Sequence, residues 1–220
     1  KVYYSYSHST TRLKLVMEKQ TVFIVDDDES VRESLSLLLN LKQFKVRAFS
    51  SAQDFLTTYQ PTWPGCLLLD IRMPGMSGLE MQAELVKRAI ALPVIMLTAH
   101  GDVATTRTAL KTGAFDFLEK PVDDDLLLDV VSNALSVDTN QRATEKKEHD
   151  QSEKISKLTN PERQVMDLLT EGRHNREIAE SLGISPRTVE VYRARMMEKL
   201  QARNLADMIR MVLEMRNIKK

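Results

Sequence analysis

Five side chains that could take part in chemistry follow short apolar segments of this chain: Asp26, Asp27, Asp70, Thr98 and Lys120. A single aspartate after an apolar run is usually the start of a loop, because aspartate is a common turn residue. Here each of the five residues ends an apolar run or lies within two residues of its end. Independent loop residues would not share this register, so we treat the five as one candidate site.

The residue types of this candidate site suit phosphoryl transfer onto Asp70. Carboxylates about 4 Å apart repel each other by roughly 4 kcal/mol per pair at an effective dielectric constant near 20, and they raise each other's pKa unless a cation lies between them. Oxygen ligands at a partly open site favour Mg²⁺. A carboxylate nucleophile, a dication, a hydroxyl and an ammonium would neutralise and position a phosphoryl group. Thr98 and Lys120 would then hold its oxygens.

A parallel sheet would bring these residues to one edge. The segment 67–70 is an uninterrupted apolar run that ends in Asp70 and is closed by Pro74 and Gly75, a pattern typical of a strand buried on both faces. Asp70 would lie at the carboxyl end of that strand, where open α/β sheets place their chemistry.

Strand and helix patterns alternate five times along the first part of the chain. Such alternation predicts an α/β fold with a doubly wound, five-stranded parallel sheet and right-handed crossovers. The expected strands are 22–25, 46–49, 67–70, 93–98 and 115–118, and the expected helices run from Ser30, from 52 to 59, from 78 to about 88, from 103 to 112 and from 123 to 136.

The second part of the chain has a different, all-helical pattern. Residues 137–157 are polar with alternating charges and lack glycine and proline, so we expect a helical linker. Four helices are expected in 158–217. Their starts are marked by a capping box at Thr159 and Glu162, a cap at Asn175, Ser185-Pro186, and Asn204.

Composition excludes several classes of protein. Residues 17–135 hold 11 Lys and Arg against 17 Asp and Glu, a balance of −6, whereas 158–220 hold 12 against 9, a balance of +3, which makes the tail the candidate for nucleic-acid binding. The single cysteine excludes an internal disulfide. The four histidines are too widely spaced for a zinc site, and no apolar run approaches the roughly 18 residues of a membrane span. Residues 1–16 lack the apolar core of a secretion signal and are expected to be an extension outside the fold.

Four motifs in residues 17–136 resemble the receiver domain of bacterial two-component response regulators, in the family's order and spacing. They are Val25-Asp26-Asp27-Asp28, the segment from Leu69 to Gly78, Leu97-Thr98-Ala99-His100-Gly101-Asp102, and Phe117-Leu118-Glu119-Lys120-Pro121. The likeness is to the FixJ-type branch of that family. It implies a flavodoxin-like strand order 2-1-3-4-5 and phosphorylation of Asp70 by the phosphohistidine of a sensor kinase.

The resemblance also implies roles for individual residues of the receiver. Mg²⁺ would be held by Asp27, Asp70 and the Arg72 carbonyl, with Asp26 acting through water. Phe117 would be the switch aromatic that follows Thr98 inward, besides any packing role. The peptide bond before Pro121 would be cis. His100 occupies a position that tunes dephosphorylation in the family, and Val122 departs from the phenylalanine that is usual there.

The tail resembles the four-helix DNA-binding domain of the LuxR/NarL type, including the opening segment 158–163 in which Pro161 stands in the first turn. Segment 175–195 has a helix-turn-helix layout. Core spacing on its second helix gives an inward stripe of Val189, Met196 and Leu200. The outward set is Glu190, Val191, Ala194, Arg195 and Glu198, of which Glu190, Val191, Ala194 and Arg195 are candidates for base contacts, while Arg187, Thr188, Tyr192 and Lys199 are candidates for contacts to the DNA backbone.

The sequence thus predicts an extension (1–16), a receiver domain (17–136), a helical linker (137–157) and a DNA-binding domain (158–220). Its function would be that of a phosphorylation-activated transcriptional regulator in the cytoplasm, with a sensor histidine kinase, promoter DNA, RNA polymerase and a second copy of itself as partners, and no membrane. One alternative is a phosphohydrolase with an aspartate nucleophile, but Arg72 stands where such enzymes need a second Asp. Another is a regulator that binds DNA regardless of phosphate, or a protein-interaction module with a degenerate receiver.

Overall fold

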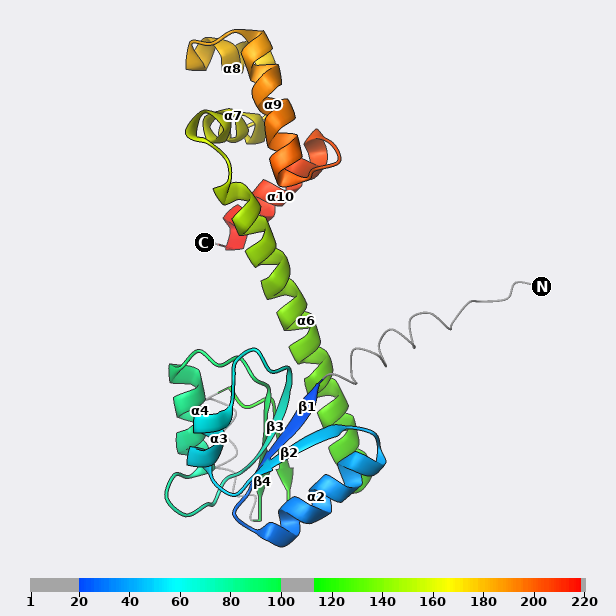
Figure 1. Cartoon of the computed structure of the whole chain (residues 1–220). Coiled ribbons are helices and arrows are strands. Elements are labelled where there is room, and N and C mark those ends of the chain that lie inside the picture. Colours follow the sequence, from blue (N-terminus) through cyan, green and yellow to red (C-terminus); the bar gives the residue numbers. More distant parts are fainter. Residues whose placement is uncertain (1–19, 100–112, 219–220) are drawn as a thin grey trace, which may run out of the picture. The chain divides into compact units, whose positions relative to one another are not determined.

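The computed structural model describes residues 20–99 and 113–218. The described residues form two compact units, which meet between Arg142 and Ala143 (Figure 1). Each unit is described by itself. The expected extension 1–16, the expected helix 103–112 and His100 lie outside the described residues.

The first unit is built on a five-stranded parallel sheet with the order β2-β1-β3-β4-β5. The order implied by the resemblance is confirmed, and so is the alternation of strands and helices within the described residues. The strands are β1 (Thr21–Val25), β2 (Lys45–Phe49), β3 (Gly65–Asp70), β4 (Val94–Thr98) and β5 (Asp116–Glu119).

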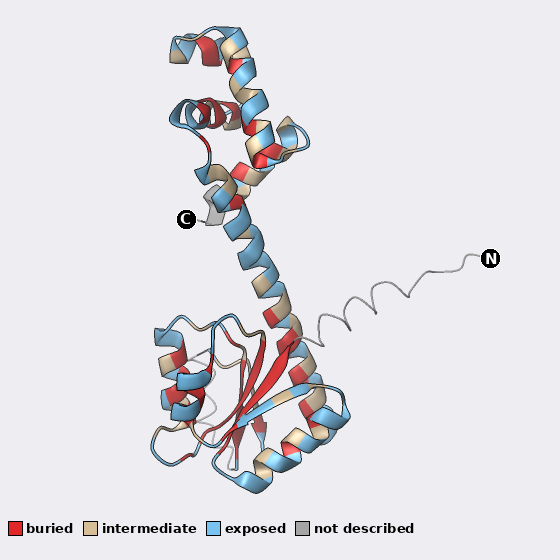
Figure 2. Ribbon diagram, in the orientation of Figure 1, coloured by how far each residue is buried: buried red, intermediate tan, exposed pale blue. Residues whose placement is uncertain are grey.

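Helices cover both faces of this sheet. Alternate residues of each inner strand point to opposite faces, so Phe23 and Leu67 pack against α3 (Ala52–Thr58) and α4 (Gly78–Lys87). Their neighbours Ile24 and Leu68 pack on the other face against α2 (Glu29–Leu41) and the first half of α6 (Asp124–Ser156). Figure 2 shows the buried residues gathered on the strands and on the helix sides that face them.

The residues after the strands start the helices that follow. The Asp28 side chain accepts hydrogen bonds from the backbone amides of Ser30 and Val31 and caps α2. Ser51 caps α3 in the same way through the Asp54 amide. Ser77 forms a capping box with Glu80 at the start of α4. Each cap satisfies backbone amides that have no partner within the helix. The cap therefore fixes the residue at which the loop after the strand ends and the helix begins.

Helix α6 is 33 residues long and changes character along its length. Residues 127, 130, 131, 134 and 135 are buried apolar side chains on the sheet. From Ala143 on most side chains are exposed, as Figure 2 shows. The helical state of residues 137–156 agrees with the expectation drawn from the absence of glycine and proline.

The second unit contains four helices after the end of α6: α7 (Asn160–Thr170), α8 (Asn175–Leu182), α9 (Pro186–Leu200) and α10 (Leu205–Ile218). Their apolar stripes form one core centred on Val165, Ile178, Val189 and Met208. The four expected helices are confirmed, and their N-caps at Thr159 and Ser185 are as expected. Asn204 accepts a hydrogen bond from the Asp207 amide at the start of α10.

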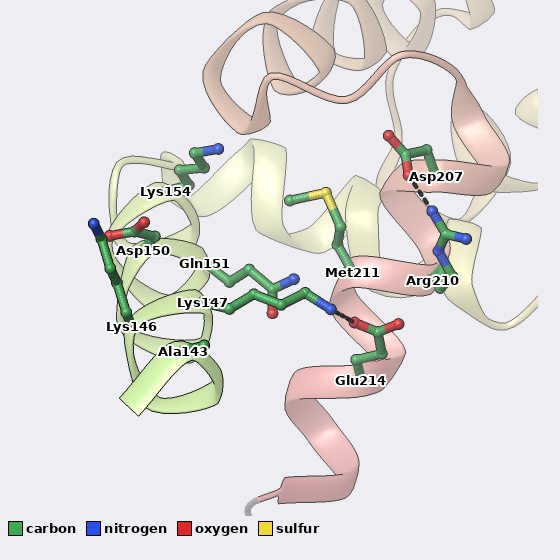
Figure 3. A pocket seen from close by; sticks show the side chains of 10 residues that line it. All are labelled: Ala143, Lys146, Lys147, Asp150, Gln151, Lys154, Asp207, Arg210, Met211 and Glu214. Atoms are coloured by element: carbon green, nitrogen blue, oxygen red, sulfur yellow. Dashed lines mark hydrogen bonds and ion pairs between the residues drawn. The ribbon is translucent and has the colours of Figure 1, made fainter. Parts of the chain in front are cut away.

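The last turns of α6 pack against this second core. Ile155 is half-buried against it and Leu158, just after the helix, is fully part of it. Figure 3 shows the seam between α6 and α10, where Lys147 donates to Glu214 and the side chains of Gln151 and Met211 line the same pocket. Arg163 of α7 donates to backbone carbonyls in the closing turn of α6. The second unit therefore begins before the first residue of α7.

Candidate functional site

Two buried carboxylates lie side by side at the carboxyl edge of the sheet. Strands β1 and β3 are neighbours, and Val25 of β1 lies opposite Leu69 of β3. Asp26 follows Val25 and Asp70 follows Leu69, so the two aspartates also lie opposite each other. Asp26 is 1% exposed and Asp70 is 5% exposed. The close turn after β3 depends on Gly78, because a Cβ there would lie 2.2 Å from the Asp70 carbonyl oxygen.

The Lys120 side chain joins these two carboxylates. Its Nζ lies 2.6 Å from Asp26 Oδ2 and 2.5 Å from Asp70 Oδ1. The backbone holds the residue at this edge, because the Lys120 amide donates to the Thr98 carbonyl at 2.6 Å. The Lys120–Pro121 peptide is cis, as the resemblance implied. Aspartates and lysine that are distant in the sequence thus meet at one point.

Burial and charge act against each other in this cluster. Burial raises the pKa of Asp70 above its ordinary value; the Lys120 ammonium opposes this rise and the Asp26 carboxylate adds to it. Burial alone would lower the pKa of Lys120, but hydrogen bonds to both carboxylates outweigh it and leave that pKa raised. Two acids that share one buried cation are short of positive charge.

The remaining residues predicted for the receiver site differ in how close they lie to this centre. The Asp70 Oδ2 atom accepts a hydrogen bond from the Arg72 amide at 2.7 Å, so the Arg72 backbone lies beside the carboxylate. The Thr98 side chain is buried at the end of β4, and Phe117 is half-buried against the core. Asp27 is exposed, unlike its neighbour Asp26.

Sequence reasoning missed the role of Arg32 at this edge. Its guanidinium donates to the carbonyls of both Asp26 and Asp27 at 2.9 Å and so fixes the acidic turn. A basic residue one turn into the helix that follows the turn is the signal that would have indicated it.

The donor chemistry of this site fits Mg²⁺. Within 20–99 and 113–218 no three His, Cys, Asp or Glu side chains form a ready metal cluster, so the structure gathers two of the three predicted carboxylates. Mg²⁺ keeps several waters and is commonly held by one or two carboxylates. Two buried carboxylates with the Arg72 backbone beside one of them meet that requirement.

The second unit carries a helix-turn-helix. Helix α8 ends at Gly183, whose φ of 65° turns the chain into α9. Val189, Met196 and Leu200 are 0% exposed, so the expected inward stripe is confirmed. The outward set is exposed, as expected: Glu190, Val191, Ala194, Arg195 and Glu198.

Several residues predicted to contact DNA already have partners within the domain. Arg187 forms an exposed ion pair with Glu190 at 3.2 Å. Lys199 is only partly exposed and donates at 2.7 Å to Glu162, which is 2% exposed. Lys199 therefore ties α9 to α7, a structural contact that the sequence did not reveal. Tyr192 is half-buried against the core, and the Thr188 hydroxyl lies 2.8 Å from that of Ser185.

The expectation that Asn175 caps α8 is wrong. The N-cap is His174, whose amide donates to the Glu177 carboxylate at 2.7 Å. The Asn175 side chain instead accepts a hydrogen bond from Arg193 of α9 at 2.8 Å. This bond joins the two helices of the motif, and it competes with the local capping that asparagine usually provides.

Comparison with known families agrees with both units. The model for the response regulator receiver domain matches residues 22–132, and the model for bacterial regulatory proteins of the luxR family matches residues 156–212. The transcriptional regulatory protein FixJ of Azorhizobium caulinodans is 44% identical over 196 residues, which cover 89% of this chain and 93% of that protein. The chain belongs to the FixJ-type response regulators.

Other relatives span nearly the same length of this response regulator. Nodulation protein W of Bradyrhizobium diazoefficiens is 42% identical over 193 residues, or 88% of this chain and 85% of that protein. The solved structure of the response regulator StyR has a TM-score of 0.85 at 42% identity and covers 89% of this chain and 99% of that one. None of the helices in the described part of the response regulator has the length and apolar composition needed to cross a membrane.

Proposed function

We propose that Asp70 accepts a phosphoryl group from the phosphohistidine of a sensor kinase, and that this modification controls promoter binding by the helix-turn-helix. The observation that carries the proposal is the buried pair of Asp26 and Asp70 around the Lys120 ammonium. A structural ion pair needs one carboxylate per cation. The second buried carboxylate, whose pKa is raised by burial, is explained by a site that awaits more positive charge.

In this mechanism an Asp70 carboxylate oxygen attacks phosphorus while the bond from phosphorus to the donor nitrogen breaks. The product is an acyl phosphate on Asp70 and a histidine that leaves with the bonding electron pair. Lys120, freed from one carboxylate, and the Thr98 hydroxyl bind the new phosphoryl oxygens. Mg²⁺ would be held by Asp27, Asp70 and the Arg72 carbonyl, with Asp26 acting through water, and it would supply charge neutralisation when bound.

The modified receiver passes its state on through Thr98 and Phe117. Movement of the hydroxyl toward the phosphoryl group leaves space behind β4, and the half-buried Phe117 ring fills it. The receivers then pair, and two DNA-binding domains meet half-sites about one helical turn apart and recruit RNA polymerase. Because its proposed partners are a sensor kinase and a promoter, we propose that the protein acts in the cytoplasm.

The exposed face of α9 supplies the contacts to DNA. Glu190 can accept from cytosine, Val191 and Ala194 can meet a thymine methyl group, and Arg195 can donate to guanine. The residues proposed for the DNA backbone are Arg187, Thr188, Tyr192 and Lys199. Of these, Arg187 is more available for DNA than Lys199. The Arg187–Glu190 ion pair is exposed and contributes little to stability, so it is easily exchanged for a phosphate contact, whereas Lys199 is paired with the buried Glu162.

The proposal is tested by labelling the whole protein with acetyl phosphate and Mg²⁺. We expect one phosphoryl group per chain, lost on treatment with hydroxylamine as an acyl phosphate is. Asp70→Asn should remove the label. Asp54→Asn, an exposed aspartate on α3, is the matched control and should label as the unchanged protein does.

Labelling of Asp70→Asn at the same rate would place the acceptor elsewhere and end the assignment. Labelling that continues at full rate when EDTA removes the metal would end the role given to Mg²⁺. DNA binding that does not respond to full labelling would favour the alternative in which the tail acts regardless of phosphate.

A further inference from the structure

A second buried polar cluster lies at the edge of the sheet opposite Asp70. Its centre is Asp138, a residue of α6 that is only 1% exposed. This carboxylate accepts hydrogen bonds from Gln20 Nε2 at 3.2 Å, the Gly65 amide at 2.9 Å and Arg142 Nε at 2.7 Å. We call these four residues the α6 anchor.

Arg142 extends the α6 anchor to the loop before β3. One of its terminal nitrogens donates to the Pro61 carbonyl and the other to the Trp63 carbonyl, both at 2.9 Å. The Tyr59 hydroxyl also donates to the Trp63 carbonyl, at 3.2 Å. A planar guanidinium that binds one carboxylate and two carbonyls is held in a single orientation, so this turn of α6 is fixed against the loop.

The two strands that carry the acidic site are the ones tied to the α6 anchor. Gln20 immediately precedes β1, which leads to Asp26, and Gly65 opens β3, which ends in Asp70. Each strand thus has a site carboxylate at one end and a bond to Asp138 at the other. Gly65 is required there, since a Cβ would lie 1.8 Å from the Thr21 carbonyl oxygen.

The α6 anchor also lies at the end of the part of α6 that belongs to the first unit. Arg142 is the final residue of that unit, and the next residues of α6 are exposed. A buried ion pair adds little net stability, because well-packed apolar residues of similar size often stabilise the folded state as much or more. Apolar packing would, however, let the helix slide or rotate, whereas directional hydrogen bonds hold one position.

We propose that Asp138 and Arg142 are positioning residues that fix the point at which α6 leaves the receiver, and that the DNA-binding response to phosphorylation depends on them. This inference rests on the proposed function of Asp70. The two residues take no part in phosphoryl transfer, because they lie at the other end of the strands.

The test uses the full chain with Asp138→Asn, which keeps the size and shape of the side chain but removes the charge and one acceptor oxygen. The amide nitrogen of asparagine, itself a donor, would then face one of the groups that donate to Asp138. Asp129→Asn, an exposed aspartate of the same helix, is the matched control. Labelling by acetyl phosphate should be unchanged in both. The gain in DNA affinity on labelling should fall about tenfold in Asp138→Asn alone, the scale of one lost charged hydrogen bond. Amide hydrogen exchange over residues 135–142 should become faster only in that variant.

Each outcome bears on a different claim. A full DNA-binding response in Asp138→Asn, with faster exchange over 135–142, would show a merely structural role and overturn the inference. Absence of labelling in the unchanged protein would instead end the proposed function. If Asp138→Asn does not fold, Arg142→Lys keeps the charge and loses the bonds to the loop. It should show the same labelling with a reduced response, and a full response there would equally overturn the inference.

Discussion

At the scale of single residues, burial and charge have opposite effects in the receiver site: burial disfavours the ionised forms of Asp70 and Lys120, and the ion pair between them favours these forms. The Lys120 ammonium lies within hydrogen-bonding distance of two carboxylates that are almost completely buried. Burial raises the pKa of Asp70, and the Lys120 ammonium opposes that rise. Positive charge therefore stabilises the ionised site, and this makes the site responsive to an added cation.

Replacing Lys120 with methionine should destabilise the metal-free protein by about 3–5 kcal/mol at neutral pH, as breaking a buried ion pair does. The deficit should shrink as the pH falls. Burial already raises the pKa of Asp70, and removal of Lys120 raises it further. Between the pKa of Asp70 in the unfolded chain and its higher pKa in the folded variant, the folded state therefore binds more protons than the unfolded state. Stability then falls with rising pH across that window and is recovered below it.

Urea unfolding at pH 5 and pH 8 in EDTA measures this effect, with the exposed Lys42→Met as the control. An equal loss of stability at both pH values would mean that lost packing rather than uncompensated charge is responsible.

Arg195 should read DNA sequence. It is exposed on α9, and a base-contacting arginine contributes about 1–3 kcal/mol of discrimination. Arg195→Ala should weaken binding to the true operator by that amount and leave binding to random DNA nearly unchanged, as measured by competition gel shifts. Arg210→Ala, on α10, is the control. An equal loss on random DNA would reassign Arg195 to phosphate contact.

At the scale of elements, α6 serves two cores with one helix. Its first half packs on the sheet, and its last turns pack on the second core through Ile155. Arg163 binds carbonyls at the end of α6, and Lys147 pairs with Glu214. The opening motif of the DNA-binding domain therefore makes contacts in two directions. Glu162 accepts a hydrogen bond from Lys199 of α9, and Arg163 donates to carbonyls at the end of α6.

A fragment of residues 143–220 should be more stable than one of 158–220 by roughly 1–3 kcal/mol, from burial of Ile155 and the bonds to Arg163. Urea midpoints measure the difference, and a gel shift shows whether both fragments bind DNA, as we expect. Equal midpoints would mean that the end of α6 adds nothing to the folded domain.

Most of the elements were predictable because each is marked by a local pattern. The strand 67–70 is an apolar run closed by proline and glycine, and Ser185-Pro186 starts a helix by capping geometry. Convergence of Asp26, Asp70 and Lys120 was predictable because the carboxyl ends of parallel strands share an edge.

The contacts that could not be predicted from the sequence are those of polar side chains whose partners lie far away in the chain or on another element. Asn175 was expected to cap its helix, but Arg193, eighteen residues away, takes its side chain. Asp138 and Arg142 were assigned to a polar linker, although their spacing continues the buried stripe of Leu127, Val131 and Ala134. A polar residue in phase with an apolar stripe is a signal for a buried polar contact.

At the scale of the whole molecule, phosphorylation must change the balance of two states. A shift from about 1:99 to 99:1 takes about 5.5 kcal/mol. New charged hydrogen bonds from Thr98 and Lys120 would supply roughly 1.5–3 kcal/mol each. Together the two bonds supply roughly 3–6 kcal/mol, which reaches the requirement only at its upper end. A second source of free energy is therefore needed, and pairing of two receivers provides one that depends on concentration.

Labelled protein should therefore sediment as a dimer and bind two half-sites together. Insertion of half a helical turn, about 5 base pairs, between the half-sites should remove the joint binding, because the second domain then faces the wrong side of the DNA. Insertion of a whole turn, about 10 base pairs, should restore part of it. Asp70→Asn should stay monomeric and be insensitive to either insertion. If labelled protein remained monomeric yet bound its operator more tightly, the added free energy would have to act within one chain, and the α6 anchor would become the place to look for it.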